Sequence, residues 1–378
     1  MPDLHFTLVQ LFAQIPDHRN PSGRRYSLAS VLSLAVAAMI CGYKSYSAIA
    51  EWGRNYGERF ALALGFKAGK TPCAATFFNI FSKLDLNLLE QILSRWAQHL
   101  LASNPDDDNC ETLAIDGKSL RGSINQGAQA AHILSAFSHR LGITLFQVAV
   151  PDKTNEIGAI KELLDQVVLT DRLITTDSML TQRKVCEKII KEGGDYCLPV
   201  KANQPTLLAQ IEATIEAVEF HSQPPQRAQT IDCGHGRIEE RKIISTPAMR
   251  DHDAWPGLEQ VFKIERRVVE RRSGKESYEE VYGITSLSQG RADADVILSI
   301  VRGHWGIENK SHWVRDVIYE EDRSQVRVGS VPQVMAALRN TAIGLIRAAG
   351  ESGIASGGRR FAAQPAAALA LIGVYITP

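Results

Sequence analysis

The sequence predicts an α/β protein with a mixed β-sheet core of element order βββαβαβα. An all-α domain precedes this core, and a β-rich insertion interrupts it. Three observations support this prediction. Apolar residues recur at helical spacing up to residue 103, short β-branched runs alternate with helical segments from Glu111, and strand patterning returns over residues 222–288. Consecutive strand–helix units imply parallel neighbours in the sheet.

The composition is that of an ordinary globular protein and excludes several classes. A chain of 378 residues is long enough for two or three domains, and its zero net charge gives no global basic field. Six cysteines without a close pair argue against a zinc cluster or a disulfide framework. The longest apolar stretch, Leu28–Cys41, is too short to span a bilayer, and no signal peptide is evident. We therefore expect a cytoplasmic protein without a membrane partner.

Residues 1–103 form the predicted all-α domain. Its central element is an almost wholly apolar helix from Ser27 to Ile40. Further helices are expected at Tyr46–Phe60, Ala75–Leu84 and Asn87–Leu101. The acidic run at residues 104–109 lacks apolar anchors and is interpreted as the linker to the next domain.

The core is predicted over residues 111–221 and 289–349. Its elements, in order, are strands at 112–116, 132–138 and 144–150, a helix at 156–167, a strand at 172–176, a helix at 181–191, a strand at 195–200 and a helix at 204–219. The insertion at 222–288 carries strands at 241–245, 261–269 and 279–284. Helical sequence resumes at 292–317 and 331–349, and the tail at 350–378 holds a small-residue loop at 350–358 and a helix at 365–372.

Two aspartates follow predicted strands. Asp116 ends the apolar run that starts at Thr112 and is expected to enter a Gly-Lys turn, and Asp177 follows the strand at 172–176. Carboxylates at adjacent strand ends repel one another unless a cation lies between them, and Mg²⁺ is the usual one. Glu308 is the candidate for a third carboxylate, and three such groups suit two-metal phosphoryl transfer. Asp177 could instead cap the helix that follows it.

The third acid has rivals, namely Asp316, Glu320, Glu321 and Asp322. Glu308 is preferred because helical spacing places it on one face with His304 and Arg315, as in a polar cleft. His304, Glu308 and His312 also form a stripe that could bind zinc, although the HExxH spacing is missing. Trp305 and Trp313 lie beside this stripe, and such a pair is more often core than a platform for stacking bases.

Collinear motifs across the chain carry a resemblance. They include Asp116-Gly-Lys-Ser-Leu-Arg-Gly-Ser, Lys153-Thr-Asn-Glu-Ile, Thr176-Asp-Ser-Met, Lys201-Ala-Asn-Gln, Gly234-His-Gly-Arg-Ile-Glu-Glu-Arg and the segment from Arg302 to Val317. In these motifs the sequence resembles insertion-sequence transposases of the ISAs type, the H-repeat-associated group. The resemblance implies an RNase H-like DDE core whose metal-binding, catalytic acids are Asp116, Asp177 and Glu308. It also shows a departure, because the steps that hold Tyr, Arg and Lys in related DDE transposases hold Val301, His304 and Arg315 here.

The function implied by the resemblance is DNA transposition. Mg²⁺, with Mn²⁺ as a substitute, would support strand cleavage and strand transfer at insertion-sequence ends. The partners would be terminal inverted repeats, target DNA and a second copy of the chain in the active complex. Two alternatives stay open: an RNase H-like nuclease or junction resolvase without strand transfer, and a degenerate element-encoded protein that binds DNA without cutting it.

Local basic patches would neutralise DNA phosphates. The predicted DNA-binding residues are Lys118, Arg121, Lys201, Arg237, Arg241, His304 and Arg315. Further patches are Arg19 with Arg24 and Arg25, Lys242 beside Arg241, and Arg266, Arg267, Arg271 and Arg272, each of which could equally be a solvated charged face. The all-α domain is predicted to bind the element's ends or to dimerise.

Overall fold

The computed structural model describes residues 7–104, 110–124, 129–150, 156–220, 224–234, 236–250 and 255–376. The chain forms two compact units. The first unit comprises Met1–Asp107, Gly117–Ala159 and Ile307–Pro378, and the second comprises Asp108–Asp116 and Ile160–Gly306. The predicted linker at 104–109 falls outside the described residues from residue 105 on, as do residues 153–155 of the Lys153-Thr-Asn-Glu-Ile motif.

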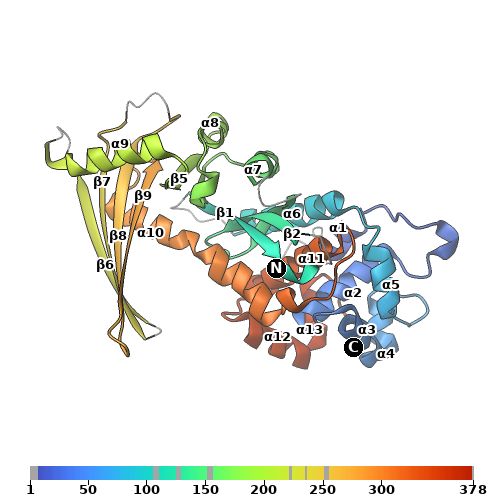
Figure 1. The fold of residues 1–378 in the computed structure, drawn as a ribbon. Coiled ribbons are helices and arrows are strands. Elements are labelled where there is room, and N and C mark those ends of the chain that lie inside the picture. Colours follow the sequence, from blue (N-terminus) through green and yellow to red (C-terminus); the bar gives the residue numbers. More distant parts are fainter. Residues whose placement is uncertain are drawn as a thin grey trace. The chain divides into compact units, whose positions relative to one another are not determined.

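The first unit is mainly helical (Figure 1). Its N-terminal helices are α1 (Leu8–Phe12), α2 (Leu28–Ile40), α3 (Tyr46–Asn55), α4 (Gly57–Ala63), α5 (Ala74–Phe81) and α6 (Leu86–Ala102). Its C-terminal helices are α11 (Val331–Ala348), α12 (Ile354–Ala363) and α13 (Pro365–Leu371). The predicted helix at Tyr46–Phe60 is therefore two helices, because Gly57 adopts a positive φ of 73° that breaks the winding.

Helix α2 is the centre of the first unit. Ser27 caps it by accepting from the backbone N–H of Ser30, and nearly every residue from Leu28 to Ile40 is buried. It packs against α1 and α3 and also against α11, α12 and α13 (Figure 1). Helices on both sides of the predicted linker thus contribute to the packing around α2.

Helix α12 was not predicted, since its sequence looked like a small-residue loop. Ile354 and Phe361 are buried, and α12 packs against α2 and α11. Gly357 approaches Ile346 so closely that a Cβ would lie 2.7 Å from its Cγ2. The small residues therefore permit close helix packing instead of forming a loop.

Three strands begin the sheet: β1 (Glu111–Leu120), β2 (Ala131–Ser138) and β3 (Thr144–Val150). β2 and β3 pair antiparallel, as predicted, with His132 opposite Val150. β1 is longer than predicted. It continues through Asp116 and Gly117 to Leu120, so the predicted Gly-Lys turn is wrong and Asp116 lies inside a strand. The strand passes from the second unit to the first between these two residues.

The second unit holds α7 from Ile160 on (the helix spans Glu156–Asp165), β4 (Arg172–Thr176), α8 (Arg183–Lys191), β5 (Asp195–Val200) and α9 (Pro205–Glu216). β1 pairs with β4, and β4 with β5, both in parallel. The predicted order βββαβαβα is therefore present along the chain. Strands β4 and β5 have the bounds that the sequence predicted.

The insertion is an antiparallel extension of the same sheet (Figure 1). Its strands are β6 (Gln226–Gly234), β7 (Arg237–Thr246), β8 (Gln260–Glu270) and β9 (Glu276–Thr285). Within the second unit the strand order is β1-β4-β5-β9-β8-β7-β6, so β9 joins the insertion to β5. The sequence predicted three of these strands and missed β6. Ile243, Phe262 and Ile264 form a core with Ile297 and Leu298 of α10 (Ala294–His304).

The first unit contains an uncommon helical winding. Residues Glu308–His312 and Val314–Ile318 form π-helix, with hydrogen bonds five residues apart, and a short 3-10 turn follows at Glu321–Arg323. π-Helical turns are rare and occur often at functional sites. The changed winding also alters which residues share a face. None of the helices among the described residues has the length and apolarity that crossing a membrane requires.

Candidate active site

In the second unit, β1 and β4 bring two aspartates to the same level. These strands are parallel, and the last pair in their register joins Ile115 to Thr176. The next residue on each strand is an aspartate, so Asp116 and Asp177 follow side by side. Neighbouring strands lie about 4.8 Å apart. Carboxylates on neighbouring strands repel one another when they lie close, and a cation between them offsets this repulsion. The sequence prediction that these two strands are neighbours is confirmed, although Asp116 lies inside β1 and not at its end.

Asp177 also has a local structural role. It precedes the 3-10 turn Ser178–Leu180, and its Oδ1 accepts hydrogen bonds from the backbone N–H of Ser178 and, at 3.1 Å, from the Ser178 hydroxyl. The side chain is otherwise exposed. Asp177 therefore caps this 3-10 turn, whereas the N-cap of the helix α8 that follows is Gln182. A cap uses one carboxylate oxygen, which leaves the other available to a ligand.

Glu308 begins the π-helical segment in the first unit. Its side chain is 53% exposed, and its Oε2 lies 2.9 Å from Nδ1 of the buried His312. The hydrogen bond from His312 lowers the pKa of Glu308; burial opposes this shift, and the charges of His312 and Lys118 add to it. Glu308 is therefore an ionised and accessible carboxylate. Lys118, which influences it, lies two residues after Asp116 on β1.

The four rival acids are engaged elsewhere in the first unit. Asp316 accepts from Lys118 at 2.5 Å, and Glu320 from Lys44 at 3.1 Å. Asp322 accepts the backbone N–H of Arg121. Glu321 is buried between two arginines. These positions favour Glu308 as the third acid.

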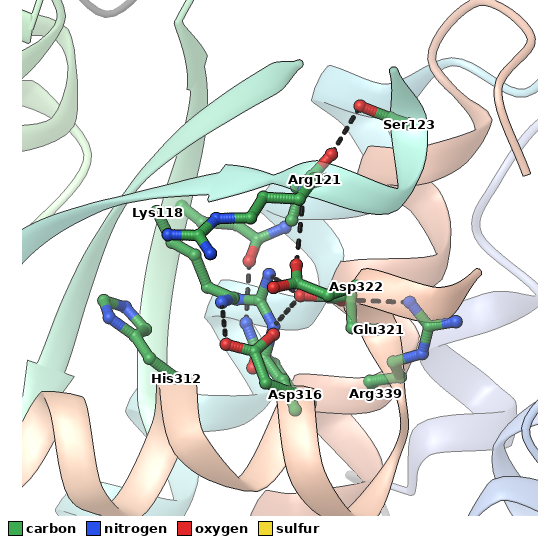
Figure 2. Close-up of polar contacts among 12 residues, drawn as sticks. Lys118, Arg121, Ser123, His312, Asp316, Glu321, Asp322 and Arg339 are labelled. Carbon is green, nitrogen blue, oxygen red and sulfur yellow. Dashed lines mark hydrogen bonds and ion pairs between the residues drawn. The ribbon is translucent and has the colours of Figure 1, made fainter. Parts of the chain in front are cut away.

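Figure 2 shows the network around Glu321. Its Oε2 accepts from Nε of Arg315 at 2.8 Å, and its Oε1 accepts from Nη1 of Arg339 at 2.9 Å. All three side chains are almost fully buried. Burial favours the neutral form of Glu321, but the charges of the two arginines outweigh it and hold the pKa of Glu321 below its ordinary value. The sequence analysis did not predict this ionised cluster.

The position of Arg315 differs from the one that the sequence predicted. It was expected to share an exposed face with Glu308 and to contact DNA, but its exposure is 0%. The π-winding separates the two side chains, so that Glu308 is exposed while Arg315 points to Glu321. In this structure the guanidinium is not available to a phosphate.

The other predicted DNA-binding residues divide into two groups. Lys118 is buried and pairs with Asp316 (Figure 2). His304 Nδ1 lies 2.9 Å from the Thr175 hydroxyl, and Arg241 pairs with Asp232 at 2.8 Å and with Glu239. These three cations thus have partners within the protein. The second group is exposed at the surface and consists of Arg121, Lys201 and Arg237.

The arginines of the insertion also contact acids. Arg266 lies 3.3 Å from both Glu239 and Glu279, and Arg267 lies 2.7 Å from Glu276. These pairs match the interpretation of a solvated charged face. The two exposed tryptophans differ from expectation, because Trp305 is 59% and Trp313 52% exposed. Neither belongs to the core.

Oxygen-rich groups dominate the candidate metal ligands. Asp116 in the second unit and Glu308 in the first offer carboxylates, and His312 in the first adds an imidazole nitrogen. Asp177 in the second unit is a further exposed carboxylate. Hard divalent ions such as Mg²⁺ and Mn²⁺ prefer this donor set. The predicted stripe is seen only in part: in the first unit Glu308 Oε2 lies 2.9 Å from His312 Nδ1, whereas in the second unit His304 Nδ1 lies 2.9 Å from the Thr175 hydroxyl.

Two family models match the chain. The model described as "Transposase DDE domain" matches residues 111–345, and the model described as "DDE_Tnp_1-associated" matches residues 9–97. The first covers more than half of the chain. The chain therefore belongs to the family of transposases with a DDE domain, a family whose domain implies the use of divalent metal ions.

Related proteins match this chain over nearly its whole length. The chain is 32% identical over 348 residues to "Putative transposase YncI" of Escherichia coli O157:H7, covering 90% of this chain and 87% of that protein. It is 28% identical to "H repeat-associated putative transposase YhhI" of Escherichia coli K12, covering 90% of each. The resemblance to the H-repeat-associated group is thus confirmed. A structural match to a piggyBac transposase, solved as a synaptic complex with hairpin DNA, covers 97% of this chain and 78% of that one, at 11% sequence identity. Its TM-score of 0.46 is too low to establish a common fold.

Proposed function

We propose that this protein cleaves DNA at the ends of an insertion sequence and transfers those ends to target DNA. The catalytic core would be RNase H-like, with Asp116, Asp177 and Glu308 holding two divalent ions, Mg²⁺ or Mn²⁺. The observation that carries the proposal is the parallel register of β1 and β4, which sets Asp116 and Asp177 side by side. Membership of the DDE transposase family supports it.

The chemistry consists of two exchanges at phosphorus. In cleavage, a water oxygen bonds to the phosphorus and the 3′-oxygen leaves with a proton, which yields a 3′-hydroxyl and a 5′-phosphate. In transfer, that 3′-hydroxyl attacks a target phosphodiester and a target 3′-oxygen leaves in turn. Divalent ions, when bound, offset the charge that develops on the phosphate and acidify a nearby water. The three carboxylates supply the anionic oxygens that hold such ions.

DNA binding would rest on the exposed cations. We assign phosphate contacts to Arg121, Lys201 and Arg237, because their side chains reach solvent. Arg24 and Arg25 are exposed in the loop before α2 and are candidates for contacts to the element's ends. A complex that joins two ends needs two active sites, so we propose that a dimer acts.

The test uses a labelled DNA duplex that carries the repeats flanking the gene, incubated with Mg²⁺ or with EDTA. We expect cleavage in Mg²⁺ only, and its loss in Asp116→Asn, Asp177→Asn and Glu308→Gln with end binding retained. Glu320→Gln is the matched control, since Glu320 is an acid near Glu308 in sequence that pairs with Lys44. It should cleave like the wild type. Full activity in Asp116→Asn would refute the assignment.

A second assay separates the proposed function from its alternatives. An end with a free 3′-hydroxyl is mixed with supercoiled target DNA, and joined products are detected on a gel. Cleavage without joining would identify a nuclease or resolvase. End binding without either product would identify a degenerate protein. The proposed contacts of Arg24 and Arg25 with the element's ends are tested by measuring end binding in Arg24→Gln and Arg25→Gln. Deleting residues 1–100 would not test them, because the deletion would uncover the core that α2 shares with α11.

A further inference from the structure

A buried polar pair lies behind the strand that carries Asp116. His132 is on β2 and Glu156 begins α7, and both are in the first unit. His132 Nε2 lies 2.5 Å from Glu156 Oε1, and His132 Nδ1 lies 3.0 Å from the Ser119 hydroxyl. His132 and Glu156 are only 2% and 5% exposed. The imidazole is thus held at both nitrogens between two partners.

The pair presses against the backbone of β1 at Gly117. A Cβ at this position would lie 2.6 Å from Glu156 Oε1 and 2.7 Å from His132 Nε2. Both distances are shorter than any ordinary contact of a methyl carbon. Glycine at this position leaves the room that Glu156 and His132 occupy, and a larger residue would displace one or both of them.

The position of this contact relates it to Asp116. Side chains alternate along a strand, so Gly117 and Ser119 face the pair while Asp116 and Lys118 face the other side. The pair packs against Gly117, the residue that follows Asp116. It holds the adjacent peptide unit, and the orientation of that unit sets the direction in which the Asp116 side chain leaves the strand.

Stability alone does not explain such a pair. Buried polar or charged pairs contribute little compared with apolar residues of similar volume, because desolvation offsets their attraction. They do fix geometry, since short polar contacts tolerate little displacement. Groups that orient metal ligands from behind commonly change metal affinity or activity by about 10- to 100-fold when removed.

We propose that His132 and Glu156 are positioning residues, which fix β1 at Gly117 and thereby aim the carboxylate of Asp116. This inference rests on the proposed function, because it places Asp116 in a metal site. It gives a task to Glu156, one of the two described members of the Lys153-Thr-Asn-Glu-Ile motif, which the proposed reaction does not use.

The experiment compares the full-length wild type with Glu156→Gln and Glu156→Ala. Three quantities are measured: Mn²⁺ affinity by electron paramagnetic resonance, cleavage of end DNA as a function of Mg²⁺ concentration, and end binding in EDTA. We expect Mn²⁺ affinity to fall about 10-fold in Glu156→Ala and less in Glu156→Gln. The Mg²⁺ concentration for half-maximal cleavage should rise in parallel, while end binding stays within about twofold of the wild type.

The matched control is Glu90→Gln. Glu90 is a buried glutamate of the same unit whose carboxylate accepts from Gln147. Its replacement should leave Mn²⁺ affinity and metal dependence unchanged. Gly117→Ala provides a second variant, and it should weaken Mn²⁺ binding by itself, because the added Cβ would displace the same pair, Glu156 and His132.

The outcomes separate this inference from the function on which it rests. If the wild type binds Mn²⁺ and cleaves ends, and Glu156→Ala does both with unchanged metal dependence, the positioning role is refuted and the proposed function stands. A reduced rate without any change in Mn²⁺ affinity would refute it as well. If the wild type neither binds Mn²⁺ nor cleaves, the proposed function fails and the inference falls with it.

Discussion

Replacing Glu321 by glutamine tests the ionised cluster most directly. The substitution keeps the size and shape of the side chain and removes only its charge. Two buried guanidinium groups, those of Arg315 and Arg339, would then face each other without a carboxylate. Breaking a buried ion pair by removing one partner costs about 3–5 kcal/mol. Because one carboxylate serves two arginines here, we expect a loss at the upper end, about 5 kcal/mol.

The assay is urea unfolding followed by circular dichroism at pH 5, and Glu90→Gln is its control. Both glutamates are buried, but their charges differ. Burial raises the pKa of Glu90 to about 8, so it is protonated at pH 5, whereas the two arginines hold the pKa of Glu321 below its usual value. Glutamine should therefore replace Glu90 within about 1 kcal/mol. Equal losses in the two variants, or an unchanged free energy of unfolding in Glu321→Gln, would contradict this reasoning.

Three further predictions concern stability and DNA affinity. Because the pKa of Glu90 is raised to about 8, the unfolded chain loses this proton at a lower pH than the folded protein, and the free energy of unfolding falls as pH rises from about 4.5 to 8. Glu90→Gln should remove this decline, which amounts to about 3 kcal/mol at pH 7. Lys118→Met should lower the free energy of unfolding by about 2 kcal/mol, because it breaks the pair with Asp316, and should leave the salt dependence of DNA binding unchanged. Lys201→Gln should instead reduce the slope of log K against log salt by about one, because Lys201 is exposed to DNA phosphates. Gly283→Ala should lower the free energy of unfolding by about 2 kcal/mol, because a Cβ there would overlap the ring of Phe262; an unchanged urea midpoint would contradict this.

Local sequence signals predicted the strands that flank the site. The β-branched run at 172–176 and the run at 195–200 have the observed bounds, because burial on both faces of a parallel sheet selects such residues. Their parallel pairing followed from the intervening helices. The adjacency of Asp116 and Asp177 was therefore predictable from pattern and topology together.

Other features depend on residues far apart in the sequence. Gly117 looked like a turn, but it is required by His132 and Glu156, which no local pattern connects to it. Arg315 looked exposed at ordinary helical spacing, but in the π-helical segment it lies in the interior and pairs with Glu321, a carboxylate that the distant Arg339 also contacts. α12 forms from a small-residue segment because it packs on α2, more than 300 residues earlier. Tertiary packing decided each of these cases.

The burial of α2 by the C-terminal helices has a consequence for synthesis on the ribosome. α2 ends at Ile40, and its partners α11 to α13 begin at Val331. At translation rates of about 5–20 residues per second, roughly 15–60 s pass before these partners emerge. During that time the apolar surface of α2 lacks its final cover, which exposes the nascent chain to aggregation and chaperone binding. A premature stop codon after residue 330 would spare every proposed metal ligand and still leave the protein without a completed core.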